Sequence, residues 1–590
     1  MGLSLIPQIH LWIVRGRDWK GAYVAIQGDE PLYSAYVNAL IDGRTRKNDP
    51  FGGRDSVLVS PLPESTFSIQ FMPAYAIALT AKTLHISAST AFIVLAAVTA
   101  LLASVSIFWL LDSVMGDYRF ASAGTLFVLC LGGAVGTYGL FGTLIDAAIP
   151  ALPFLRRYEP AAAFPFFFVF QILVWKALTS ESKRTMGLTA VLAALTLVAL
   201  IFSYLYLWTA AAAWLGCISA LWLYFRVVDR RKTFAVLTTI TLITSLALVP
   251  YAYMLSHRAT VLDEQHTLMA THRPDLLRLP EIIGAMILVG LVIGWFRNKI
   301  EQNESRTIYA MSLAVLPFII FNQQMLTGKT MQVFHFDLFV INYSTLIGLL
   351  VAVSLLWRSV PRRLLIWLGA LSLAWGVFSV ALPARLVFVP SAAARDQRIP
   401  VLLRLKEISN LDGTRSDLRT HGQASTLVFS PDLAVTVLLP TWTPQGTLLD
   451  IGGVECGNVS REERKEFFYM HLYYSKVQSE DLREAFNGVP GNPTMERYAP
   501  IAVFGSERVS PALTFDFKPI QPNEIEREVQ AYQAYLNSFS RAEALKRPIT
   551  YAVIPVEGNF DFSNLDRWYE RDAGEHVGIY TLYRLKLRPE

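Results

Sequence analysis

The chain has 590 residues, of which 53% are hydrophobic and 17% are charged, and its formal net charge is +5. This composition, with a mean hydropathy of +0.37, excludes a set of ordinary soluble domains and indicates that much of the chain lies in lipid. Lysine and arginine form no block of the kind that binds nucleic acid, so no nucleic-acid partner is expected. Of the three cysteines, only Cys456 lies in the polar C-terminal third, which excludes an intramolecular disulfide or a cysteine-based zinc site in that third.

Residues 1–87 contain an adjacent acidic pair, Asp29 and Glu30, in a segment that is not itself apolar. The residues that follow the pair have helical periodicity, with Leu32, Tyr36 and Leu40 on one face. We expect this face to lie on a membrane helix bundle and to hold the two carboxylates at its N-terminal edge. A second helix, over residues 67–84, is predicted to lie at the membrane interface.

The acidic pair has two interpretations. In the functional one, Asp29 and Glu30 supply a general base, or a carboxylate associated with a divalent metal, that acts on an acceptor hydroxyl at the membrane face. In the other, the pair belongs to a solvated turn or caps a helix. The position of the pair, just before a helix that faces the bundle, favours the functional interpretation.

Long apolar runs follow from residue 88 onward, and a membrane span needs about 20 residues. The runs are 88–111, 120–141, 160–175, 187–225, 233–256, 282–296, 307–328, 338–357 and 364–384. The 187–225 run is long enough for two helices, which we expect to meet near residues 203–206. The sequence therefore predicts a polytopic α-helical membrane protein with about ten transmembrane helices over residues 88–385.

Charges in the loops predict the orientation of the bundle. Every second loop is basic, with Lys183 and Arg184, then Arg230 and Arg231, then Arg297 and Lys299, then Arg362 and Arg363. Basic loops face the cytoplasm, so the other loops, residues 1–87 and everything after about residue 385 are expected outside it. We expect an integral protein of a bacterial inner membrane. An even number of spans with both ends outside suggests one missing N-terminal span, with Met1 as an internal start or a truncation.

Several polar residues fall in the loops predicted to face outward. Arg156 and Arg157 suit a lipid-linked phosphate or pyrophosphate, because arginine offers bidentate contacts, although a charged flank at a helix end is the alternative. Gln323, Lys329 and His335 form a predicted rim in which the amide binds sugar hydroxyls, the lysine binds phosphate and the histidine acts as an acid, base or hydrogen-bond donor. Capping of helix ends is the alternative here.

The loop over residues 256–281 holds three histidines, His257, His266 and His272. Their spacings of nine and six residues match no standard metal-ligand pattern. We therefore interpret the loop as one that becomes ordered when substrate binds, with His257 among the substrate contacts. A metal site is the alternative.

Residues 395–590 have mixed charge and predict an extracytoplasmic α/β domain. Strands are expected at 426–429, 434–439, 502–504, 551–556 and 579–585, and long helices at 460–486 and 522–546. Ser460 with Glu463 three residues later has the spacing of a capping box.

Over about residues 20–385, this layout resembles the GT-C class of integral-membrane glycosyltransferases. The resemblance consists of the acidic motif Gly28-Asp29-Glu30 in a large first outer loop, the many spans after it and an outer soluble domain. It implies an enzyme that moves a sugar from a polyprenyl-phosphate carrier to a hydroxyl of a glycan, lipid or protein acceptor. It also implies that Asp29 is the base, with Glu30 as its neighbour.

By the same resemblance, Arg156, Arg157 and Lys329 would stabilise the phosphate leaving group, and the lipid-linked donor would enter from the membrane lipids. No nucleotide cofactor is implied, and a divalent metal is left open. Two alternatives are a non-catalytic scaffold or assembly subunit derived from this class, and a lipid or solute transporter.

Overall fold

The computed structural model describes residues 1–55, 62–136, 152, 155–259, 262, 269–357, 360–411, 426–449, 459–489, 493–505, 508–509 and 518–589. Within these residues, eight helices are long and apolar enough to cross a membrane. They are α5 (Ala88–Met115), α6 (Tyr118–Val135), α9 (Lys183–Ile201), α10 (Leu205–Phe225), α11 (Arg230–Ser256), α13 (Leu279–Phe296), the continuous run of α16 (Val333–Phe336), η4 (Asp337–Ile341) and α17 (Asn342–Leu356), and the run that begins with α18 (Arg362–Pro383).

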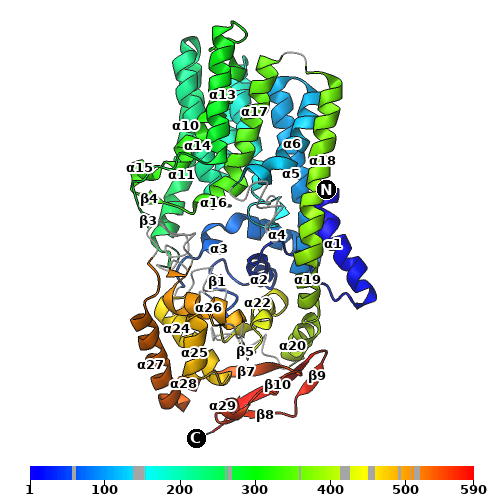
Figure 1. The fold of residues 1–590 in the computed structure, drawn as a ribbon, viewed down its shortest axis with the longest axis vertical. Coiled ribbons are helices and arrows are strands. Elements are labelled where there is room, and N and C mark those ends of the chain that lie inside the picture. Colours follow the sequence, from blue (N-terminus) through cyan, green and yellow to red (C-terminus); the bar gives the residue numbers. More distant parts are fainter. Residues whose placement is uncertain are drawn as a thin grey trace.

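Two shorter apolar helices, α8 (Phe164–Thr179) and α14 (Ser305–Phe321), pack in the same bundle. The prediction of a polytopic helical protein is therefore confirmed, and these two helices occupy two of the predicted apolar runs. The break between α9 and α10 falls at residues 202–204, where the sequence predicted two helices to meet. The loops from α10 to α11 and from α13 to α14 lie at the end of the bundle opposite the C-terminal domain (Figure 1).

The first part of the chain forms α1 (Gly2–Arg15), the short helix η1 (Gly16–Asp18), α2 (Glu30–Ile41), the short strands β1 (Asn48–Asp49) and β2 (Arg54–Asp55), α3 (Thr66–Ile69) and α4 (Phe71–Thr83). The helix predicted after the acidic pair is thus α2, and the predicted interfacial segment forms α3 and α4. Helix α2 packs against α4 and α5 on one side and against α22 (Leu433–Trp442) of the C-terminal domain on the other (Figure 1). It is therefore buried almost throughout, at the junction of the bundle with the C-terminal domain.

From α18 the chain continues through η5 (Ala384–Phe388) and α19 (Val389–Asp396) into the C-terminal domain. Its helices are α20 (Ile399–Leu411), α22, α24 (Arg461–Tyr474), α25 (Ser479–Phe486), α26 (Pro493–Phe504), α27 (Pro522–Ser538), α28 (Arg541–Lys546) and α29 (Ser563–Asp566). Its strands are β5 (Leu427–Phe429), β6 (Gly446–Thr447), β7 (Ile549–Pro555), β8 (Tyr569–Arg571), β9 (Glu575–Val577) and β10 (Tyr580–Leu587). The sheet order is β6-β5-β7-β10-β8, with β9 also paired to β10. The strands β6, β5 and β7 run parallel, and β10 is antiparallel to its neighbours, so the domain is α/β as predicted.

Two predicted strands of this domain are wrong. Residues 434–439 lie in α22, and residues 502–504 form the end of α26. The β-branched residues of the first segment suggested a strand, but Asp432 caps a helix there by accepting a hydrogen bond from the backbone N–H of Ala434, at 2.9 Å. Both predicted long helices are also interrupted. The first breaks after α24, where Lys476 has a positive φ of 55°, and the second breaks between α27 and α28.

Candidate functional site

Asp29 is the residue that precedes the first turn of α2, and its carboxylate remains partly open to solvent, with 31% of the side chain exposed. Pro31 in the first turn suits this start, because the position needs no backbone N–H. The Oδ2 atom accepts a hydrogen bond from the Tyr33 hydroxyl at 3.2 Å and forms an ion pair with the Arg156 guanidinium. Tyr33 lies one helical turn after Asp29, which places both side chains on one face of α2. The Oδ1 atom of Asp29 has no hydrogen-bond partner among the described residues.

Arg156 is buried in the segment that leads into α8. It donates a hydrogen bond to the Tyr33 hydroxyl at 2.6 Å in addition to its ion pair with Asp29. Its guanidinium carbon lies 5.4 Å from the ring centre of Tyr33 and 5.6 Å from that of Phe339 in η4. A cation at this distance from aromatic rings is stabilised by their negative faces. Arg156 thus joins α2 to the start of a bundle helix.

His335 in α16 belongs to the same neighbourhood. Its ring centre lies 5.4 Å from that of Phe339, and its Nδ1 atom lies 2.7 Å from the hydroxyl of Tyr204. The ring of Tyr206 packs against it at 4.4 Å. Asp29, Arg156 and His335 are therefore brought together, through Tyr33 and Phe339, at the end of the bundle that faces the C-terminal domain.

Glu30 and Arg157 point elsewhere. Both are buried, with 0% and 1% of their side chains exposed, and they face each other at 3.3 Å. Glu30 also accepts a hydrogen bond from the backbone N–H of Ile26 at 2.7 Å, and Arg157 donates to the backbone carbonyl of Phe92 at 3.0 Å. Burial raises the pKa of Glu30, while the charge of Arg157 opposes that rise. This pair connects the segment before α2 to α5, and neither side chain is open to a substrate.

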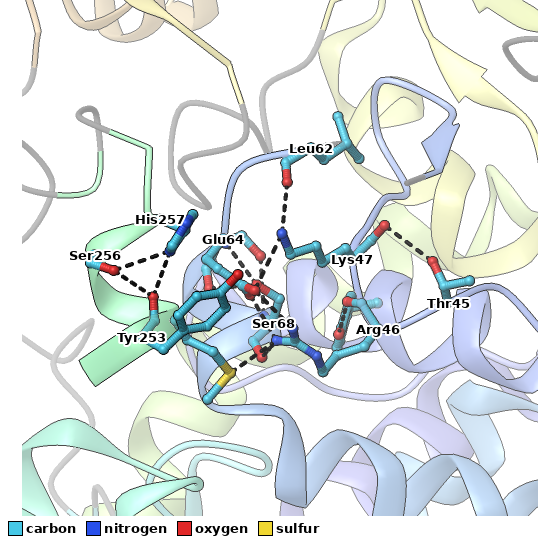
Figure 2. Close-up of polar contacts among 12 residues, drawn as sticks. Thr45, Arg46, Lys47, Leu62, Glu64, Ser68, Tyr253, Ser256 and His257 are labelled. Carbon is cyan, nitrogen blue, oxygen red and sulfur yellow. Dashed lines mark hydrogen bonds and ion pairs between the residues drawn. The ribbon is translucent and has the colours of Figure 1, made fainter. Parts of the chain in front are cut away.

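His257 lies at the exposed end of α11 (Figure 2). Its Nδ1 atom lies 2.8 Å from the backbone carbonyl of Tyr253, and its own carbonyl accepts a hydrogen bond from the Glu64 N–H at 2.9 Å. Glu64 is in turn held by a bidentate ion pair with Arg46, at 2.7 and 2.8 Å. Although burial alone would raise it, hydrogen bonds from Arg46 and Ser68 hold the pKa of Glu64 below its usual range. This cluster fastens the end of α11 to the segment that leads into α3.

Lys329 and Gln323 lie close to each other. Lys329 is exposed in β4 (Lys329–Thr330), which pairs with β3 (Met269–Ala270). Gln323 precedes α15 (Gln324–Thr327) and donates a hydrogen bond from its amide to the Lys329 carbonyl at 3.0 Å. The predicted metal alternative rested partly on His266, which lies outside the described residues. Among the residues that the structure describes, no group of three His, Cys, Asp or Glu side chains is arranged to hold a metal ion.

Sequence reasoning did not single out Tyr33 or Phe339 as members of this site. Tyr33 had a detectable signal, because residues four apart on a helix are neighbours and Asp29 was already a candidate. Phe339 had none, because it reaches the site through tertiary packing of a distant segment.

No protein-family model matches the sequence, and no curated protein matches it. The structure is similar to that of the Archaeoglobus fulgidus oligosaccharyltransferase tethered with an acceptor peptide, at 12% identity and a TM-score of 0.42, covering 98% of this chain and 73% of that one. It is also similar to ArnT from Cupriavidus metallidurans bound to undecaprenyl phosphate, at 12% identity and a TM-score of 0.41, covering 99% of this chain and 98% of that one.

Both of these proteins are GT-C glycosyltransferases, the class that the layout of the sequence resembles. At this level of similarity, the likeness concerns the overall architecture and says nothing about individual residues.

Proposed function

We propose that the protein is a membrane glycosyltransferase that moves a sugar from a polyprenyl-phosphate carrier to an acceptor hydroxyl. The observation that supports this most is the pairing of a partly exposed carboxylate, Asp29, with a buried guanidinium, Arg156, where α2 meets the ends of the bundle helices. Such a pair supplies both groups that the transfer needs, a base for the acceptor and a cation for the leaving phosphate.

The donor side is built around Arg156. Its guanidinium is bound to Asp29 and Tyr33. A phosphate that reaches Arg156 from the bundle would compete for the same N–H groups and would release the Asp29 carboxylate for the acceptor. His335, held at 2.7 Å by the Tyr204 hydroxyl, is placed to contact the phosphate or the sugar from the bundle side.

The acceptor side is built around Asp29. As the acceptor oxygen forms a bond to the anomeric carbon, its proton passes to the Asp29 carboxylate. The bond from the anomeric carbon to the phosphate oxygen breaks, and its electron pair leaves with the polyprenyl phosphate, so the configuration inverts. The Oδ1 atom of Asp29 is buried and has no hydrogen-bond partner among the described residues, so the proton would pass to Oδ2 once Arg156 has left it.

We place this site outside the cytoplasm. Two of the basic loops, from α10 to α11 and from α13 to α14, lie at the end of the bundle opposite α2 and the C-terminal domain (Figure 1). Basic loops ordinarily stay on the cytoplasmic side, so the site would face the outer side of the membrane.

The proposal is tested with the full chain in lipid nanodiscs and a panel of radiolabelled polyprenyl-phospho-sugars. We expect release of polyprenyl phosphate with at least one donor, and a loss of about 100-fold or more in Arg156→Gln, because a cation at the leaving group is removed. Arg119→Gln, at an exposed residue of α6 at the far end of the bundle, is the matched control and should retain activity.

If every polyprenyl-phospho-sugar in the panel stays intact, the proposal is contradicted and a non-catalytic scaffold is favoured. Movement of intact donor across a liposome membrane, without cleavage, would favour a transporter.

A further inference from the structure

A buried hydroxyl connects the break between α9 and α10 to the histidine of the site. Tyr204 is the residue before the first turn of α10, and 2% of it is exposed. Its hydroxyl oxygen lies 2.7 Å from the Nδ1 atom of His335. The ring of His335 lies 5.4 Å from that of Phe339, which the Arg156 guanidinium also faces, at 5.6 Å. Tyr204 therefore acts directly on His335 and, through it, on the donor side of the site.

The direction of this hydrogen bond follows from the hydroxyl. A tyrosine hydroxyl carries one proton to donate, and a buried donor that lacks an acceptor destabilises the fold. Burial raises the pKa of Tyr204 well above its usual value of 10, so the proton stays on the oxygen. Within the part of the chain that the structure describes, the Nδ1 atom of His335 is the one hydrogen-bond partner of this hydroxyl. Tyr204 therefore donates, and Nδ1 accepts.

This direction determines where His335 carries its proton. A neutral imidazole has one protonated nitrogen, so when Nδ1 accepts, the proton is on Nε2. A proton on Nδ1 would turn the hydroxyl into the acceptor and would leave the proton of Tyr204 without an acceptor among the described residues. An imidazolium, protonated at both nitrogens, would do the same. His335 is therefore neutral, and Nε2 is its donor atom.

Three aromatic rings fix the orientation of the imidazole. Those of Tyr206, Phe334 and Phe339 lie 4.4, 4.3 and 5.4 Å from it, between ring centres. Because Nε2 lies across the ring from Nδ1, its hydrogen points away from Tyr204. The charge of Arg156, which faces the same Phe339 ring, also disfavours a second cation beside it.

We propose, on the basis of the proposed function, that Tyr204 is a positioning residue that holds His335 in the form protonated at Nε2, and that this Nε2–H donates to a phosphate oxygen of the lipid-linked donor. The oxygens of a phosphodiester accept hydrogen bonds, so an N–H suits them. The form protonated at Nδ1 would instead present the lone pair of Nε2 to an anionic oxygen. Of the three roles that the sequence left open for His335, acid, base or hydrogen-bond donor, the geometry selects the third.

The first test measures the position of the proton in the full chain in lipid bilayers, by nitrogen NMR with isotope-labelled histidine. The chemical shift of a ring nitrogen depends strongly on whether it carries a proton, and the signals of His335 are those lost in His335→Gln. We expect a protonated Nε2 and an unprotonated Nδ1 in the wild type. In Tyr204→Phe, which keeps the ring and loses the hydroxyl, the form protonated at Nδ1 should appear. Tyr224→Phe, at an exposed tyrosine near the other end of α10, is the matched control and should leave the signals unchanged.

The second test measures binding of a polyprenyl methyl phosphodiester to the same samples. This probe carries the charge of the donor and has no sugar to transfer. In the wild type, its binding should shift the Nε2 signal of His335 more than the Nδ1 signal. Tyr204→Phe should bind it about threefold to tenfold more weakly, as for the loss of one net hydrogen bond, whereas Tyr224→Phe should bind it like the wild type.

The results that would overturn the inference are separate from those that concern the proposed function. A wild-type His335 protonated at Nδ1, which is measured whether or not Tyr204→Phe folds, would remove the role of Tyr204. Wild-type signals and affinity in Tyr204→Phe would do the same, and a bound probe that leaves Nε2 unshifted would remove the contact with phosphate. Each of these leaves the proposed function intact. A wild-type protein that does not bind the probe would contradict the donor side of the proposed function, and the contact of His335 with it.

Discussion

The two neighbouring acids of the motif Gly28-Asp29-Glu30 should respond differently to substitution by alanine. Glu30→Ala should mainly lower stability, whereas Asp29→Ala should mainly abolish transfer. Glu30→Ala leaves the buried Arg157 without its carboxylate and the backbone N–H of Ile26 without its acceptor. Removing one partner of a buried ion pair costs about 3–5 kcal/mol. Asp29→Ala removes a carboxylate that is 31% exposed, and Arg156 keeps Tyr33 as an acceptor, so we expect a loss of about 1 kcal/mol.

The assay is unfolding of each purified full-length variant in the same detergent, followed by transfer activity of the fraction that remains folded. We expect Glu30→Ala to lose at least about 2 kcal/mol more stability than Asp29→Ala, as the difference between those two costs. Folded Glu30→Ala should retain some transfer, whereas folded Asp29→Ala should retain none. Equal losses of stability, or greater activity in Asp29→Ala than in Glu30→Ala, would refute the different roles assigned to these residues.

Two further predictions concern packing and pH. A Cβ at Gly284 of α13 would lie 2.5 Å from the backbone oxygen of Ala314, so Gly284→Ala should lower stability by about 1–3 kcal/mol, measured by thermal unfolding. Gly290→Ala on the same helix, with 3.5 Å to its nearest neighbour, should be neutral or stabilising, and equal effects would contradict the close approach of α13 and α14. Burial lowers the pKa of His471 to about 4, so the unfolded chain binds its proton first, and stability should fall by about 3 kcal/mol as pH drops from 6.5 to 4. In His471→Phe, the free energy of unfolding should fall less between pH 6.5 and 4, as measured by unfolding at a series of pH values. The same pH dependence as in the wild type would contradict the lowered pKa of His471.

Much of the architecture follows from local pattern. Apolar runs, loop charges and the periodicity after residue 31 are all properties of short segments, and they predict the bundle, the break at residues 202–204 and helix α2. The strand prediction for residues 434–439 failed because β-branched residues indicate a strand only when tertiary packing does not decide otherwise. Here the segment is buried against α2 and α20, and a helix presents apolar side chains to both.

The site was predictable only in part. Asp29 and Glu30 are adjacent acids, and nothing in the sequence separates them. The rotation of α2 and the buried Arg157 make Glu30 structural and leave Asp29 facing Arg156. The adjacent Arg156 and Arg157 also have different roles, because Arg156 pairs with Asp29 and Arg157 pairs with the buried Glu30. Contacts between residues 127 positions apart decide these roles, and such contacts leave no local signal.

The most direct test of the central claim is the transfer rate of Asp29→Asn with the donor that the wild-type protein uses. Asparagine keeps the size of the side chain and an oxygen that can accept from Tyr33 and Arg156, but it cannot take a proton at neutral pH. We expect donor binding and thermal stability close to those of the wild type, with transfer reduced by about 100-fold or more, as for the loss of a general base. Transfer at the wild-type rate would contradict the assignment of Asp29 as the base.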